Sequence, residues 1–143
     1  MSAQSHLLPQ TDSGNAAARW FSTLMWIGIA ANILVAVTSI VWTDAVLDFF
    51  SLDMAQSRIW PRFAAFLLIL LTIFYVPAAL DPIAHRYAAI VSVMCRFAGV
   101  AFFSIVGGRY IVFGLYDLMF ALPQAVLLWL AWRSSGRVLE MNR

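Results

Sequence analysis

The chain has 143 residues, of which 63% are hydrophobic and only 11% are charged. Soluble domains average about 45–50% apolar and about 25% charged residues, so the composition predicts an integral membrane protein of at most one domain. The net charge of +2, from nine arginines and seven acids, is too small and too scattered for a nucleic-acid-binding surface.

Residues 1–18 are small and polar and lack the apolar core of a signal peptide. We therefore expect a flexible N-terminal tail, followed by a transmembrane domain over residues 19–133. The first apolar run, about 20–42, is long enough to cross a hydrocarbon core of about 30 Å. Asn32 lies at its centre. A hydrogen bond across a helix interface is the favoured interpretation of Asn32, and contact with a ligand or a proton path is the alternative.

Residues 43–57 alternate acids with apolar side chains. Asp44 and Asp48 share one helical face, and Val46, Leu47 and Phe50 group on the other side. This pattern predicts a short amphipathic helix in the membrane interface. Because the helix is acidic, attraction to anionic lipid is not expected to hold it. A docking surface for a partner and a plain connector both stay open.

Three further apolar runs follow, at about 63–80, 82–106 and 110–132, and a polar C-terminal tail covers residues 134–143. Asp81 is placed to cap the third helix and Pro82 to occupy its first position. Gly107 and Gly108 form a tight link of the kind that joins antiparallel helices. The predicted fold is all-α, a bundle of four transmembrane helices with a short interfacial helix between the first two.

The last two predicted spans each carry one ionisable residue deep in an apolar run, Arg96 and Asp117. A charge at bilayer depth costs about 2.5–3.5 kcal/mol even on the lenient insertion scale. Arg96 lies ~18 Å and Asp117 ~13.5 Å from the Gly108 turn along their helices, and an extended arginine side chain can cover the difference. The sequence therefore predicts a buried ion pair that sets the register of these helices.

A polar pocket is the alternative interpretation of the same residues. Arg96 and Asp117, with Asn32 and Gln124 as further candidates, could bind a quinone or a lipid by its polar head. A proton or ion pathway is a third interpretation, although no internal repeat of the kind found in most carriers is visible. No other cofactor is expected, because the two histidines, His6 and His85, cannot both ligate a haem between helices. No metal site and no catalytic motif is apparent.

One stretch, Phe63–Trp132, resembles uncharacterised small four-helix bacterial membrane proteins and is loosely similar to the DoxX-like group. The likeness rests on the Asp81-Pro82 turn followed by Arg86-Tyr87, on Arg96, and on the segment from Gly114 to Phe120. It covers about half of the chain. The resemblance implies a four-helix bundle and proximity to membrane oxidoreductases, and it implies no particular activity or ligand.

Four spans place both termini on one side of the membrane. The arginines on that side are Arg19, Arg86, Arg133, Arg137 and Arg143, against Arg58, Arg62 and Arg109 on the other. Five against three favours cytoplasmic termini. We expect a bacterial inner-membrane protein, surrounded by lipid, that acts as a non-catalytic accessory or assembly subunit of a larger complex, such as an electron-transfer complex. A quinone- or lipid-binding module is the competing function.

Overall fold

The structure, a computed structural model, describes residues 12–52 and 57–141, with side chains for 14, 16–52 and 57–134. Its helices are α1 (Asp12–Val41), α2 (Thr43–Phe49), α3 (Ile59–Leu80), α4 (Arg86–Val106), the 3-10 turn η1 (Gly108–Tyr110) and α5 (Ile111–Met141). The described residues contain no strand. The prediction of an all-α fold is confirmed.

Four helices are long and apolar enough to cross a membrane: Ala16–Val41, Ile59–Leu80, Arg86–Val106 and Gly108–Ser134. The shortest of them has 21 residues, which at about 1.5 Å per residue matches a hydrocarbon core of about 30 Å. The predicted four-helix bundle with a short helix between its first two spans is therefore confirmed.

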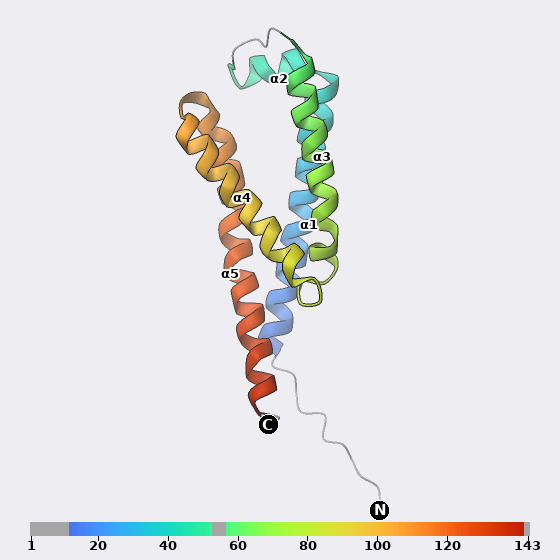
Figure 1. Cartoon of the computed structure of the whole chain (residues 1–143), viewed down its shortest axis with the longest axis vertical. Coiled ribbons are helices and arrows are strands. Elements are labelled where there is room, and N and C mark those ends of the chain that lie inside the picture. The colour runs from blue at the N-terminus through green and yellow to red at the C-terminus, as the bar shows by residue number, and fades with distance from the viewer. Residues whose placement is uncertain (1–11, 53–56, 142–143) are drawn as a thin grey trace, which may run out of the picture.

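The four long helices pack in a ring. Helix α1 lies against α3 and α5, and α4 lies against α5 and, over a shorter stretch, α3. Figure 1 shows that the α4–α5 hairpin diverges from the α1–α3 pair toward the end of the bundle that carries α2. The N-terminal end of α1 and the C-terminal end of α5 lie together at the opposite end (Figure 1).

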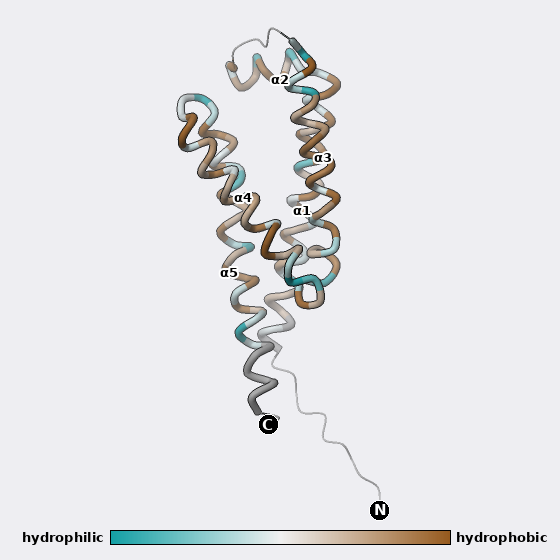
Figure 2. Tube along the Cα trace, in the orientation of Figure 1, coloured by the Kyte–Doolittle hydropathy of each residue, from teal (hydrophilic) through white to brown (hydrophobic). Residues whose placement is uncertain are grey.

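The apolar core sits in the half of the bundle nearer the termini. Its buried members include Phe21 and Met25 from α1, Tyr75 from α3, Ala89 from α4 and Leu128 from α5. Figure 2 shows hydrophilic residues concentrated at α2 and in the connections, whereas the helices between them are largely hydrophobic. This distribution is typical of a chain whose middle lies in hydrocarbon.

At the α2 end, contacts of the residues just after α2 bridge the gap to the α4–α5 hairpin. The Phe50 ring, just after α2, lies 5.1 Å from the Phe113 ring of α5, centroid to centroid. The Arg109 guanidinium donates a hydrogen bond to the Ser51 carbonyl. Gly107 and Gly108 have φ of 68° and 61°, a region that side-chain-bearing residues rarely adopt. The link at these glycines is as tight as the sequence predicts.

Both terminal helices run beyond the predicted spans. Helix α1 begins at Asp12, inside the segment expected to be a flexible tail, because its first turn packs on α5, where Gly14 lies directly against Ser134. Ala17, one turn further on, is buried. Helix α5 continues to Met141 through most of the predicted C-terminal tail. The rest of both predicted tails, residues 1–11 and 142–143, lies outside the described residues.

The third helix begins at Arg86 and not at Pro82. Asp81 Oδ1 accepts hydrogen bonds from the Ile83 and Ala84 N–H groups, at 2.9 Å each, so Asp81 caps a turn and not, as predicted, the third helix. His85 then leaves the helical region, with φ −103° and ψ 52°. The capped turn is thereby separated from α4, and Pro82 belongs to the turn.

Candidate functional site

Arg96 is the largest fully buried side chain of the described residues, with 2% of its surface exposed. It lies near the middle of α4, on the face that also carries Ala89, Ser92 and Val93, all buried. Small residues on this face allow the neighbouring helices to approach closely. The guanidinium therefore points into the bundle and not toward lipid.

Asp117 of α5 is the charged partner of Arg96. Arg96 Nη1 lies 3.4 Å from Asp117 Oδ1, and the two side chains are 1% and 21% exposed. Gly99, on α4, lies directly against the same carboxylate, since an added Cβ would stand 3.1 Å from Asp117 Cγ. The predicted contact between the two charges is present, and it aligns α4 with α5.

The guanidinium also contacts the two other long helices. Its Cζ lies 4.8 Å from the Phe120 ring centroid and 5.6 Å from that of Tyr75, both within the range of a cation–π interaction. Nη2 lies against Gly28 of α1, where an added Cβ would stand only 2.5 Å away. One side chain thus touches α1, α3 and α5 from its position on α4.

Two donors of this guanidinium have no acceptor. Within the described residues, Arg96 Nε and Nη2 are buried without a hydrogen-bond partner. Leaving a buried polar group unsatisfied costs about 1–3 kcal/mol, and more for a charged group. The aromatic faces of Phe120 and Tyr75 offset part of that cost, because they present negative potential to the cation.

Asn32 belongs to a second polar group, which joins α1, α3 and α5. Its Oδ1 accepts a hydrogen bond from the Tyr116 hydroxyl at 2.9 Å, and its Nδ2 donates to Thr72 Oγ1 at 3.4 Å. Thr72 in turn donates to the Leu68 carbonyl of its own helix. These bonds occupy both ends of the Asn32 amide, as expected for a residue that links helices.

Gln124 lies apart from the charged pair. It follows Asp117 on α5 by seven positions, about 10 Å of helical rise, and its Nε2 lies 3.8 Å from Met25 Sδ. Its Oε1 is buried with no partner among the described residues. Of the four predicted pocket residues, Arg96 and Asp117 are in contact. Asn32 bonds to Tyr116, the residue that precedes Asp117 in α5, whereas Gln124 forms no hydrogen bond with either charged residue and lies against Met25.

Three residues of this site are absent from the candidates predicted from the sequence: Gly28, Tyr75 and Phe120. Tyr75 and Thr72 are the polar residues of the predicted second span. Because polar residues are scarce there, these two could have been predicted to face the other helices and not the lipid. Gly28 lies one turn before Asn32 on the small-residue face of α1. Such a face predicts that another helix approaches closely, but it does not identify that helix. Phe120 carries no signal of its own among the many phenylalanines.

In the described part of the chain, no three His, Cys, Asp or Glu residues lie close enough to hold a metal ion. Cys95 is a half-buried free thiol. The chain matches no protein-family model, and neither a curated protein nor a solved structure shows significant similarity to it. The residues themselves therefore carry any argument about function.

Proposed function

We propose that this protein is a non-catalytic accessory or assembly subunit of a larger membrane-protein complex. The observation that carries the proposal is the enclosure of Arg96 by all four long helices. A charge used in this way fixes the helices relative to one another and is not presented to a substrate. Neighbouring subunits would then contact a bundle whose helices have fixed relative positions.

The outer surface suits lateral association in a membrane. Large apolar side chains on every long helix are exposed, among them Leu34, Phe74, Met94 and Leu115. In hydrocarbon such faces contact lipid or the helices of neighbouring subunits. The connections are short, with the α4–α5 link made by Gly107 and η1. Little of the described chain is therefore left to build a site in water.

The cellular setting is part of the same proposal. The N-terminal end of α1 and the C-terminal end of α5 lie at one end of the bundle (Figure 1), and the sequence assigns five arginines to that side of the membrane against three on the other. This bias favours cytoplasmic termini, and we propose a bacterial inner membrane as the setting. The resemblance of residues 63–132 to DoxX-like proteins suggests an electron-transfer complex as the assembly served.

The test is purification from native membranes in mild detergent, followed by native mass spectrometry. We expect an assembly in which this chain and other membrane proteins occur in constant stoichiometry. A tagged, unrelated four-helix protein from the same membranes is the control, and it should not carry the same subunits. Recovery of the chain alone, as a monomer or a homo-oligomer, would overturn the proposal.

A second function is favoured by the two unsatisfied donors of Arg96. Nε and Nη2 lie at bilayer depth, where the carbonyl of a quinone or the polar head of a lipid would supply the missing acceptors. Asp117, which is 21% exposed on its side chain, marks the side from which such a molecule would approach.

Organic extraction of the purified protein tests this second function. A binder should release a lipophilic molecule in about one-to-one ratio, and Arg96→Gln should lower that ratio sharply. Arg133→Gln removes an exposed arginine from the C-terminal half of α5 and serves as the matched control. A wild-type protein that carries no lipophile at a fixed ratio would exclude the binding module.

A further inference from the structure

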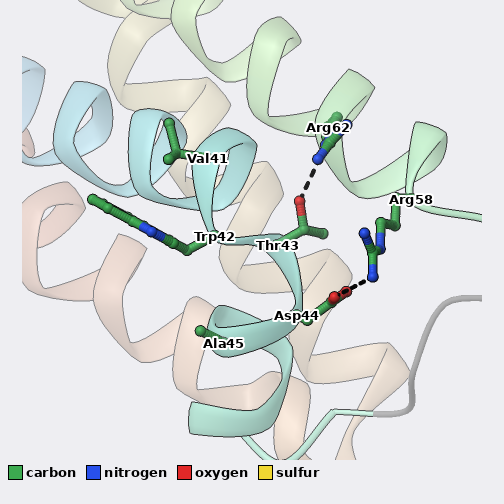
Figure 3. Close-up of a pocket in the computed structure, with 7 residues that line it drawn as sticks. All are labelled: Val41, Trp42, Thr43, Asp44, Ala45, Arg58 and Arg62. Carbon is green, nitrogen blue, oxygen red and sulfur yellow. Dashed lines mark hydrogen bonds and ion pairs between the residues drawn. The ribbon is translucent and has the colours of Figure 1, made fainter.

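A pocket of about 280 Å³ opens where α1, α2 and α3 meet. Its lining residues are Val41, Trp42, Thr43, Asp44, Ala45, Arg58 and Arg62. Figure 3 shows Arg58 reaching toward Asp44 and Arg62 toward Thr43, so both guanidinium groups lie on the α3 side of this pocket. The pocket lies at the opposite end of α1 from the termini, far along the helix from the Arg96 site.

The described lining residues give the pocket a net positive charge. Arg58 Nη2 forms an ion pair with Asp44 Oδ2 at 2.5 Å, and Arg62 Nε donates to Thr43 Oγ1 at 3.3 Å. Asp44 is the one acid among the described lining residues, so it neutralises one of the two guanidinium groups. The Nη groups of Arg62 have no partner among the described residues and keep their donors available. An arginine fork of this kind matches the geometry of a phosphate group.

The depth of the pocket along the bundle fits a lipid head group. The first candidate span ends at Val41 and the second begins at Ile59, so the pocket lies at the boundary between apolar and polar chain. Trp42 and Trp60 are both largely exposed at this level, as tryptophans at a membrane interface are. Val41 and Trp42 are the lining residues nearest to the apolar span of α1.

We propose that this pocket binds the phosphate group of a phosphate-bearing ligand, with Arg62 and Arg58 as the donors. A membrane glycerophospholipid fits the setting best, because its acyl chains can run down the apolar surface beside Val41. The volume accommodates a head group and not a whole lipid. This assignment departs from the expectation that attraction to anionic lipid does not hold the acidic helix α2, since Asp44 is paired with Arg58.

Native mass spectrometry of the purified full chain, titrated with lipid in detergent, tests the proposal. Dioleoyl phosphatidylglycerol is compared with dioleoylglycerol, which has the same acyl chains and no phosphate. We expect the phospholipid to bind about tenfold more tightly, and Arg58→Gln/Arg62→Gln to abolish that difference. Arg133→Gln, at the other end of the bundle, should preserve it. Equal binding of the two lipids to the wild type would overturn the proposal.

A second variant separates binding from folding. Arg62→Gln alone keeps the Arg58–Asp44 ion pair, and it should show an intermediate loss at an unchanged unfolding temperature. Unchanged phospholipid binding by both variants would contradict the assignment. Competition by inorganic phosphate distinguishes the sources of the group. If millimolar phosphate displaces the bound phospholipid, the site binds phosphate and its occupant is a soluble phosphate compound. If the phospholipid stays bound, the result supports a lipid as the occupant.

Discussion

At the scale of single residues, Arg96 and Asp117 form the buried ion pair in the interior of the bundle. Arg96 is 2% exposed and has one charged contact among the described residues, to Asp117 at 3.4 Å. Removing one partner of a buried pair is costly because the other charge stays behind without compensation. The unsatisfied Nε and Nη2 make Arg96 especially dependent on that carboxylate.

Asp117→Asn should therefore lower the free energy of unfolding by about 3 kcal/mol, the lower end of the range for a broken buried pair, because Asp117 is itself partly exposed. The measurement is reversible unfolding in detergent micelles, followed by circular dichroism. Asp48→Asn is the control, since Asp48 is an exposed acid of α2. It should change the stability by less than about 0.5 kcal/mol. Equal effects of the two substitutions would show that the Asp117 charge has no special partner.

Two glycines leave the space that the Arg96 and Asp117 side chains occupy. An alanine at Gly28 would meet Arg96 Nη2, and one at Gly99 would meet the Asp117 carboxylate. Each of Gly28→Ala and Gly99→Ala should cost about 1–3 kcal/mol, as overpacking of a filled interior does. Ala98→Ser adds one heavy atom at the exposed position next to Gly99 and should be nearly neutral. Thermal unfolding of the three variants checks the prediction, and a stabilised Gly99→Ala would refute it.

At the scale of elements, the spans and their order follow from the apolar runs, whereas the helix ends do not. Helix α1 extends to Asp12 because Gly14 packs against Ser134 of α5, and that contact joins residues more than a hundred positions apart. Helix α4 begins at Arg86 because His85 has non-helical dihedral angles. Long-range packing and local backbone choices of this kind leave no trace in hydropathy.

The Asp81 turn between α3 and α4 makes one element sensitive to pH. Hydrogen bonds from the backbone N–H groups, that of Ala84 foremost and that of Ile83 as well, together with nearby His85, hold the pKa of Asp81 below its ordinary value. A depressed pKa in the folded state stabilises the fold above the unfolded pKa of about 3.9. That stabilisation is lost as the pH falls through the folded value.

Asp81→Ala should accordingly cost about 1 kcal/mol at neutral pH, as the loss of a cap does. The difference in unfolding temperature between wild type and variant should shrink as the pH falls below about 4. Thermal unfolding in detergent from pH 7 to pH 3 measures it. A difference that stays constant over this range would mean that the carboxylate charge plays no part in the turn.

At the scale of the whole molecule, the meeting of Arg96 with Asp117 was predictable, because insertion cost and helical rise both point to it. The enclosure by Tyr75, Phe120 and Gly28 was not, since it depends on how α1 and α3 are rotated about their axes. For the same reason Gln124, which was predicted as a further candidate for the pocket of Arg96 and Asp117, faces Met25 instead. The sequence determines how deep in the membrane each polar residue lies, whereas the rotation and packing of the helices determine which of these residues are in contact.

The central claim is that the two opposite charges stabilise each other within the bundle. A double-mutant cycle of Arg96→Leu, Asp117→Leu and the combined variant, measured as free energies of unfolding in one detergent, tests it most directly. We expect a coupling energy above about 1 kcal/mol, with the combined variant more stable than either single variant. Additive losses, with the combined variant the least stable of the three, would contradict the pairing.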